Sequence, residues 1–368
     1  MRALIFSTLL AGLACGICAG TASADEEKIV NVYNWSDYIA PDTAEKFEKE
    51  TGIKVRYDVY DGNEVLETKL LTGGSGYDVV YPSAYPFLKN QVTAGAFLEL
   101  DKAKLANHSK IDPQALSLIA GDDPRNLHAV PYMAVTDGIG YNVAAVKQRL
   151  LPDAPTDSFA MVFDVDVVKK LSDCGVAMID APAEVIPMAM NYLHIDPKST
   201  SPDDLAKVEE LMGKVRPYIR YFHSSKYIND LANGDICVVL GWSGDILQAR
   251  TRAAESAKKL EIAYSIPREG TLINFDTMAV PKDAPHPDNA QAWINFNLRP
   301  DIAAANSSYV SYANAIPDSL PLMDKAIASD PGVFPPDAVK AKLFVVDNND
   351  AKWLRSQNRM WTRIVTGQ

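Results

Sequence analysis

The chain has 368 residues, with 47 Asp and Glu against 36 Lys and Arg, and its formal net charge is −11. This length is enough for two compact lobes rather than one core. The acidic balance argues against a nucleic-acid-binding protein, which needs basic patches, and it is compatible with a cationic ligand or simply with a solvated surface.

Residues 1–24 have the composition of a secretory signal peptide. Arg2 gives a positive start, residues 3–19 are mostly apolar, and residues 22–24 are the small residues of a cleavage site. A membrane anchor is the alternative, but the apolar stretch is short and several glycines interrupt it. We therefore expect export to the periplasm with cleavage after Ala24, and no stable membrane insertion of the mature chain.

Two cysteines remain after residues 1–24 are removed, Cys174 and Cys237. Exported proteins meet an oxidising compartment, so we expect these two residues to form a disulfide. Two separate buried thiols are the alternative. Two cysteines without a nearby histidine ligand do not make a zinc site, and we expect no metal and no other cofactor.

The first part of the mature chain alternates strands with helices. Strands are predicted at 29–34, 53–59 and 77–81, and helices at 41–51, 63–71 and 85–94. This βαβαβ order predicts a mostly parallel sheet with helices on its faces. Ligands bind beyond the carboxyl ends of the strands in such sheets. The segment from Asn34 to Asp37 and residue Ser83 both stand at strand ends.

An extended, glycine-punctuated segment from Thr136 to Asn142 follows, and it is typical of a hinge between two lobes. A second α/β unit comes after it. Its strand at 237–241 delivers Trp242 and Asp245 at its carboxyl end, and Asp276 stands just before a later strand at 278–280. Helices are predicted at 159–163, 167–171, 182–192 and 202–215, and further strands at 176–179 and 260–266.

Two short strings place a tryptophan close to an aspartate: YNWSDY at 33–38 and GWSGD at 241–245. Neither string contains Lys or Arg. A carboxylate neutralises an ammonium group, and the negative face of an indole attracts it while covering the attached apolar carbons. The alternative is that both tryptophans are core residues and both aspartates cap helices. Two such strings in one chain favour a site for an organic cation.

Catalytic motifs are incomplete in this chain. The glycines at 73–76 lead into a strand and lack the P-loop lysine, and residues 241–245 lack the second glycine of a nucleophile elbow. A carboxylate-based glycoside hydrolase is the serious enzymatic alternative, because Trp platforms also bind sugars. However, Asp37, Glu184, Asp245 and Asp276 exceed the two carboxylates that a hydrolase needs, which favours cation neutralisation. We expect a protein that is not an enzyme.

Seven motifs spread over the mature chain resemble those of the periplasmic polyamine-binding proteins, specific for putrescine or spermidine, of bacterial ABC importers. They are YNWSDYI at 33–39, GYDVV at 76–80, GIGYN at 138–142, FHSSKYI at 222–228, DLANG at 230–234, GWSGD at 241–245 and YANAIP at 312–317. The resemblance implies a type II periplasmic-binding-protein fold, in which two α/β lobes close around the ligand at a hinge. The expected division is a first lobe over 25–138 and 276–316, a second lobe over 139–275, and C-terminal helices over 317–368 that lie mainly on the second lobe.

The same resemblance implies roles for individual residues. Trp35 and Trp242 would stack on the polyamine. Three aspartates would hold its amino groups, with Glu184 contributing from the second lobe, and hydroxyl groups would add hydrogen bonds. The expected substrate-binding residues are Trp35, Ser36, Asp37, Tyr38, Ser83, Asp137, Glu184, Trp242, Asp245, Asn274, Asp276 and Tyr312.

Three positions depart from the family pattern. Asn274 stands where members usually carry a large aromatic residue, Ala134 where they often have Trp, and Asp137 where they have a small neutral polar residue. Two aromatic walls would be missing, and one carboxylate would be added if Asp137 faces the cleft. We therefore expect a weaker preference for putrescine than in the relatives. The alternative is that Met133 or Ile273 fills the space and Asp137 faces solvent.

The sequence therefore predicts a monomeric receptor that captures a cationic amine and delivers it to the permease subunits of an ABC importer. A sensor of the same fold, which signals to a membrane partner, is the alternative, because both functions would use the same closure around the ligand.

Overall fold

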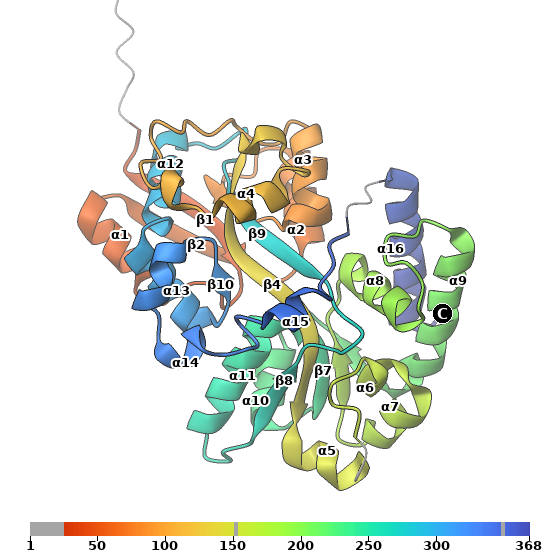
Figure 1. Cartoon of the computed structure of the whole chain (residues 1–368). Helices are drawn as coiled ribbons and strands as arrows, with labels where there is room; N and C mark the ends of the chain where they lie inside the picture. Colours follow the sequence, from red (N-terminus) through yellow and green to blue (C-terminus); the bar gives the residue numbers. More distant parts are fainter. Residues whose placement is uncertain (1–25, 151–153, 347–349) are drawn as a thin grey trace, which may run out of the picture.

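The computed structural model describes residues 26–150, 154–346 and 350–368. The predicted signal peptide at residues 1–24 lies outside this part of the chain. The described residues fold into two α/β lobes that share the long strand β4 (Ala129–Asn142), which runs from one lobe into the other (Figure 1). The predicted α/β fold with two lobes is confirmed.

The strands found in the described residues form one ten-stranded sheet of order β2-β1-β3-β9-β4-β7-β5-β6, with β8 and β10 each paired to β4. They are β1 (Ile29–Trp35), β2 (Lys54–Tyr60), β3 (Val79–Val80), β4, β5 (Val176–Met178), β6 (Ile219–Phe222), β7 (Val238–Trp242), β8 (Ile262–Ser265), β9 (Ile273–Ala279) and β10 (Ala313–Asn314).

Helices cover this sheet in both lobes. They are α1 (Thr43–Thr51), α2 (Asn63–Thr72), α3 (Lys89–Thr93), α4 (Pro113–Ile119), α5 (Val143–Leu150), α6 (Ala160–Phe163), α7 (Val165–Leu171), α8 (Pro182–Tyr192), α9 (Pro202–Val215), α10 (Tyr227–Asn233), α11 (Ser243–Glu255), α12 (Pro287–Asn297), α13 (Pro300–Val310), α14 (Lys325–Ala328), α15 (Asp337–Lys340) and α16 (Ala351–Thr366). Shorter helical turns are η1 (Ala84–Leu88), η2 (His108–Lys110), η3 (Pro124–Asn126), η4 (Arg216–Tyr218) and η5 (Pro317–Leu322).

Strand β4 changes its pairing partners at the junction of the lobes. Residues 129–136 pair antiparallel with β9, and residues 137–142 pair antiparallel with β7 or β8. The exchange falls between Thr136 and Asp137, at the start of the predicted hinge segment. Asp137 is thereby the register partner of Trp242 at the end of β7. Asp137 and Trp242, which are far apart in the sequence, therefore lie side by side at the junction of the lobes.

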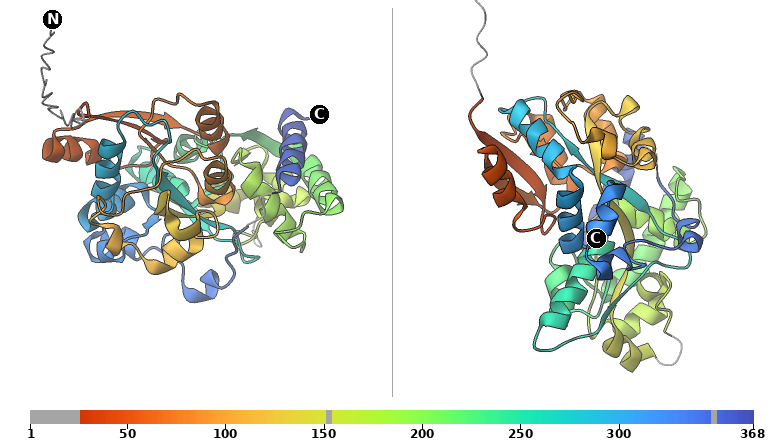
Figure 2. Two further views of the ribbon diagram at one scale, coloured as in Figure 1. Left: turned by 90° about the horizontal axis from the view of Figure 1, so that it is seen from above. Right: turned by 60° about the vertical axis from the view of Figure 1, so that its left-hand side comes forward.

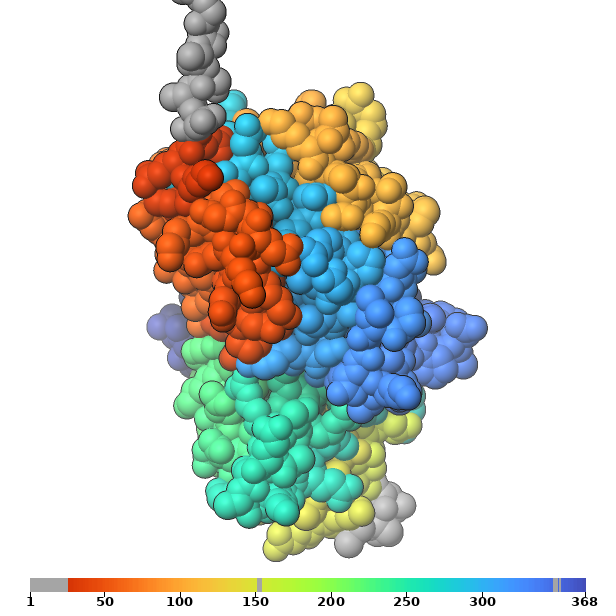
Figure 3. All heavy atoms as spheres, turned by 90° about the vertical axis from the view of Figure 1, so that its left-hand side faces the viewer, coloured from red at the N-terminus to blue at the C-terminus, as the bar shows by residue number. Residues whose placement is uncertain are grey.

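Each lobe has its own hydrophobic core. The first is built around residues such as Val32 and Trp293, and the second around residues such as Met178 and Leu240. Trp242 packs against both cores, so it lies where the two lobes meet. Figure 3 shows the second-lobe residues (green) below those of the first lobe (red, orange and light blue).

The C-terminal segment is divided between the lobes, which differs from the prediction for residues 317–368. Helix α16 packs on α8 and α9, and its residues Trp353 and Trp361 join the second core. The turn η5 and helix α14 contact α13 of the first lobe instead. Figure 2 shows α16, in dark blue, beside the light green helices and apart from α13 and α14. Of these three elements, α16 has the expected placement and η5 and α14 do not.

Local sequence explains most of the element boundaries. Helix α1 ends at Gly52, whose φ of 71° is the left-handed conformation that glycine adopts at low cost. Strand β1 is buried on both faces, as expected of a parallel strand covered by helices. Two boundaries were predicted wrongly. Asp276 lies inside β9 rather than before a strand, and the helix expected at 85–94 is broken into η1 and α3.

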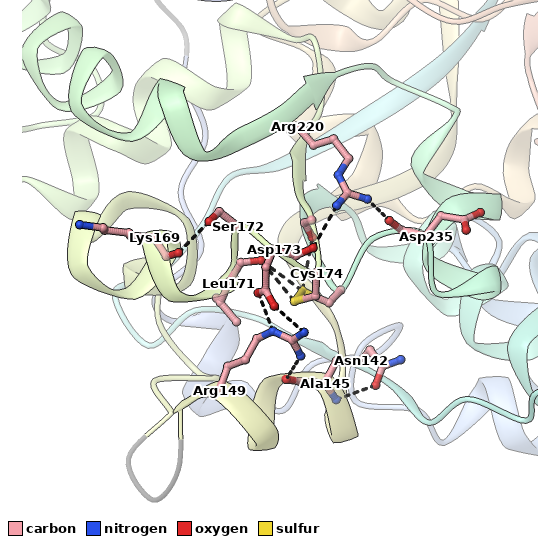
Figure 4. The surroundings of a disulfide bond; sticks show 12 residues. Asn142, Ala145, Arg149, Lys169, Leu171, Ser172, Asp173, Cys174, Arg220 and Asp235 are labelled. Carbon is pink, nitrogen blue, oxygen red and sulfur yellow. Dashed lines mark hydrogen bonds and ion pairs between the residues drawn. A yellow bond between two sulfur atoms is a disulfide. The ribbon is translucent and has the colours of Figure 1, made fainter.

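Cys174 and Cys237 form the predicted disulfide, with their Cα atoms 5.5 Å apart. Cys174 follows α7 and Cys237 precedes β7, so the bond ties a surface helix to the central sheet of the second lobe. Charged neighbours surround it (Figure 4). Arg149 forms a two-bond ion pair with Asp173, at 2.7 and 2.9 Å, and Arg220 donates to the Asp173 carbonyl oxygen.

The native protein is expected to be two hydrogens lighter by intact mass than its dithiol form, and to resist alkylation until it is reduced. The bond closes a loop of 63 residues, so its loss should lower the free energy of unfolding by roughly 4 kcal/mol on the chain-entropy model. Denaturant unfolding with and without reductant measures this difference. Two thiols that react with an alkylating reagent in the native, unreduced protein would contradict the bond.

Candidate functional site

A cavity opens between the two lobes, at the point where β4 changes partners. It holds about 540 Å³ of space that no protein atom fills, part of it open to solvent. Every predicted substrate-binding residue except Asp37 lines it, together with Tyr60, Asp61, Val135, Ser224 and Ser225. The lining contains five carboxyl groups and, among the described residues, no Lys or Arg. Such a lining suits a cation.

The two predicted tryptophans meet across the cavity. Trp35 ends β1, and its indole nitrogen donates to the Tyr81 carbonyl oxygen at 2.9 Å. Trp242 ends β7, and its indole nitrogen donates to Glu184 at 2.6 Å. Their ring centroids lie 5.5 Å apart with the planes at 72°. Both rings are therefore held by hydrogen bonds at their edges, and aromatic faces of both lobes border the same space.

Asp276 is the buried carboxyl group that the first lobe contributes to the cavity lining. It lies in β9 and forms an isolated bridge with Ser83. The Ser83 hydroxyl donates to one carboxylate oxygen at 2.5 Å, and the Tyr38 hydroxyl donates to the other at 2.7 Å. Burial raises the pKa of Asp276 to about 6, although these two hydrogen bonds oppose the rise. Asp276 is thus ionised at neutral pH and held in one orientation.

Asp245 is the carboxyl group at the start of α11. The Tyr227 hydroxyl donates to one of its oxygens at 2.7 Å and the Tyr312 hydroxyl to the other at 2.8 Å. The neighbouring Gly244 makes this possible, because a Cβ atom there would lie 2.2 Å from the Tyr312 ring. Burial raises the pKa of Asp245 to about 7 against the effect of both tyrosines.

Glu184 and Asp137 form a second acidic group in the second lobe. Glu184 lies in the first turn of α8, and burial raises its pKa to about 7, while the Trp242 and Asp137 side chains oppose the rise. Burial and the Glu184 carboxyl raise the pKa of Asp137 well above its usual value. Asp137 is therefore protonated more readily than an exposed aspartate. Its side chain is 1% exposed and lines the cavity, so it does not face solvent.

The other two positions that depart from the family pattern, Asn274 and Ala134, differ in whether they line the cavity. Asn274 lines the cavity, and its amide is fixed to the backbone of Tyr85, donating at 3.0 Å and accepting at 3.4 Å. Ala134 is not among the lining residues, whereas the adjacent Val135 is. Alternation along β4 directs the side chains of Val135 and Asp137 to the cavity and that of Ala134 to the other face. The expected loss of an aromatic wall therefore concerns position 274 and not position 134.

Asp37 lies outside the cavity lining, although the sequence placed it among the amine ligands. Its φ of 56° turns the chain after Ser36, and its carboxylate pairs with Arg252 of α11 at 2.9 Å. Ser36 stays in the lining and donates to Asp61 at 2.7 Å. The pair of Asp37 and Arg252 joins the two lobes at the rim of the cavity.

Asp37→Asn is expected to weaken amine binding by no more than about fivefold. The two side chains are 40% and 31% exposed, and exposed ion pairs contribute only about 0.2–1 kcal/mol. Arg252→Gln should have the same small effect, because either change removes the same contact. Titration calorimetry of both variants tests this. A loss of affinity of about a hundredfold in Asp37→Asn alone would show that its carboxylate binds the amine directly.

Some functional residues were missed by the sequence predictions. Tyr227 orients Asp245 but does not line the cavity itself. It belongs to the motif FHSSKYI, so the family resemblance pointed to its segment without giving its role. Tyr60 and Val135 carry no charge pattern and no turn signal, and only the register of their strands brings them to the site.

Comparisons with known proteins agree with this geometry. The chain matches the family of bacterial extracellular solute-binding proteins over residues 42–335. It is 49% identical to the putrescine-binding periplasmic protein PotF of Escherichia coli, with 98% of each chain covered, and 49% identical to the putrescine-binding periplasmic protein SpuD of Pseudomonas aeruginosa, again with 98% of each covered. A solved structure from Listeria monocytogenes, assigned to spermidine/putrescine ABC transport, has a TM-score of 0.82 at 30% identity and covers 93% of this chain and 100% of its own.

These relatives are binding proteins rather than enzymes, so the prediction of a non-catalytic solute-binding protein is confirmed over the glycoside hydrolase. In the described part of the chain, no helix has both the length and the apolar character needed to cross a bilayer. The chain belongs to the bacterial extracellular solute-binding protein family, and within it to the group of the periplasmic polyamine-binding proteins that its motifs resemble.

Proposed function

We propose that this protein captures a polyamine in the periplasm and delivers it to the permease subunits of an ABC importer. The observation that carries the proposal is the cavity between the lobes. Four buried carboxyl groups, those of Asp137, Glu184, Asp245 and Asp276, line it without a single Lys or Arg among the described residues. Buried charges need partners, and the ammonium groups of a polyamine are the missing partners here.

The tryptophans give the site its selectivity for an alkyl amine over an inorganic cation. Trp35 and Trp242 border the space between the carboxyl groups. Their rings can cover the methylene groups of the ligand and attract its ammonium ends. Because the lining residues come from both lobes, closure of the lobes around β4 completes the site. The predicted boundaries at residues 138–139 and 275–276 fall within β4 and β9, the strands at the junction of the lobes.

The cellular assignment rests on the signal peptide predicted at residues 1–24 and on the periplasmic relatives. The mature protein acts as a monomer that presents its closed form to the permease.

A thermal-shift screen of the mature protein tests the proposal. Putrescine, spermidine, agmatine, neutral amino acids and sugars are compared at the same concentration. A ligand present at a hundredfold its dissociation constant stabilises the folded state by about 2.7 kcal/mol, which is a clear rise in melting temperature. We expect such a rise with one or more polyamines and none with sugars. A sugar that stabilises the protein while every amine fails would overturn the proposal.

A further inference from the structure

We propose that Asp137 and Glu184 form a third cation subsite in the cavity, and that the preferred ligand is therefore a linear triamine rather than a diamine. This inference rests on the proposed function as a polyamine receptor and specifies the class of polyamine.

The position of Asp137 is fixed by the fold. It stands in β4 where that strand leaves β9 and joins β7, directly opposite Trp242. The indole nitrogen of Trp242 in turn holds Glu184 at 2.6 Å. The two carboxyl groups therefore lie at the hinge side of the cavity, whereas Asp276 comes from the first lobe and Asp245 from the start of α11. Three separate acidic points surround one space.

One oxygen of Asp137 has no partner. Its Oδ1 atom is buried and makes no hydrogen bond within the described residues. The other three buried carboxyl groups of the lining each accept at least one side-chain hydrogen bond. A buried polar atom without a partner costs about 1–3 kcal/mol, so it calls for a ligand or another explanation. An ammonium group placed at this point supplies both the N–H donor and the opposite charge.

Counting charges leads to the same ligand class. Two ammonium groups of a diamine can neutralise Asp245 and Asp276, which leaves the pair of Asp137 and Glu184 uncompensated. Burial and the Glu184 carboxyl raise the pKa of Asp137, and burial raises that of Glu184, so an ammonium group beside the pair would stabilise the negative charge of its ionised form. A third ammonium group neutralises that charge.

The wall next to this subsite is short and polar. Asn274 is the register partner of Val135, which is two residues before Asp137 on the same face of the sheet. Its amide is held by the backbone of Tyr85 and cannot cover a methylene chain as an aromatic ring would. The space beside Asn274 is thus open to a longer ligand, and Asp137 lies where the additional amino group of that ligand would end.

Three ligands and two variants test the inference by calorimetry. The ligands are putrescine, spermidine and octane-1,8-diamine, which matches spermidine in length but carries two charges instead of three. The variants are Asp137→Asn, which keeps the shape of the side chain, and Asp137→Ser, which removes the acid with a smaller group. We expect both variants to weaken spermidine binding by at least about tenfold. Binding of putrescine and octane-1,8-diamine should weaken clearly less than that of spermidine, and the melting temperature without ligand should be retained or raised.

The outcomes separate this inference from the proposed function. If the native protein binds no amine, the proposed function itself fails. If it binds putrescine and spermidine, but the Asp137 variants weaken all three ligands equally or none of them, the receptor stands and the third subsite is wrong. Tighter binding of putrescine than of spermidine by the native protein would also overturn the preference for a triamine.

Discussion

Asp245→Asn is expected to weaken binding of the best amine by about 30-fold or more. Truncating one partner of a buried, hydrogen-bonded charge pair typically costs about 2–5 kcal/mol. Asp245 is buried, and Tyr227 and Tyr312 already hold both of its oxygens toward the cavity. The variant keeps the shape of the side chain but leaves an ammonium group without its counter-charge, so the loss should appear mainly as faster dissociation.

The unliganded variant should melt at the same temperature as the parent or above it. Burial disfavours the ionised carboxylate of Asp245, as its raised pKa shows, and a neutral amide avoids that cost. Asp203→Asn is the matched control, because Asp203 also lies in the first turn of a helix, α9, but is exposed and does not line the cavity. Equal affinity of Asp245→Asn and the parent would remove the main support for the cation site.

The sequence was sufficient to predict which strand ends meet at the site. Trp35 and Trp242 stand at the carboxyl ends of β1 and β7, where ligands bind in α/β sheets. The two strands lie in different lobes and run in opposite directions, because three antiparallel pairings separate them in the sheet, so their carboxyl ends face each other at the junction of the lobes. The sequence indicated that each tryptophan stands at a strand end, and the antiparallel pairing of β4 with β9 and β7 brings the two rings to a centroid distance of 5.5 Å. The fold class followed from the same alternation of strands and helices.

Side-chain direction within a turn could not be predicted in the same way. Trp35, Ser36 and Asp37 are consecutive, yet the positive φ of Asp37 sends its carboxylate to Arg252 and out of the lining. A positive φ is uncommon for a residue other than glycine, and no local sequence pattern predicts it at this position. The direction of Asp137 was left open for a related reason. It depends on the register of β4 against β7, which is a long-range property.

Amine affinity is expected to fall by at least about a hundredfold between about pH 8 and about pH 5. The pKa values of Glu184 and Asp245 are raised to about 7 and that of Asp276 to about 6, in each case first of all by burial. These groups and Asp137 are the buried acids of the cavity lining, and the exposed Asp61 is the fifth acid there. At about pH 5 most of them are protonated, and a neutral carboxyl cannot balance an ammonium group. Alkyl ammonium groups titrate near the lysine value of about 10, so the ligand keeps its charge throughout this range.

The unliganded protein should show the opposite trend. A carboxyl group whose pKa is higher in the folded state than in the unfolded chain binds more protons when folded, so its contribution to stability is present below the unfolded value and is lost as pH rises. For Asp245 this window extends from the ordinary value of 3.8 to about 7. The contribution of these groups to the melting temperature without ligand should therefore decrease as the pH rises over this range. The rise in melting temperature that the ligand causes should increase over the same range.

Calorimetric affinities, and melting temperatures with and without ligand at several pH values, measure both trends. In Asp245→Asn, the pH dependence near pH 7 should be weaker than in the parent. An affinity that stays constant from about pH 8 to about pH 5 would show that the amine is not bound by these buried carboxylates.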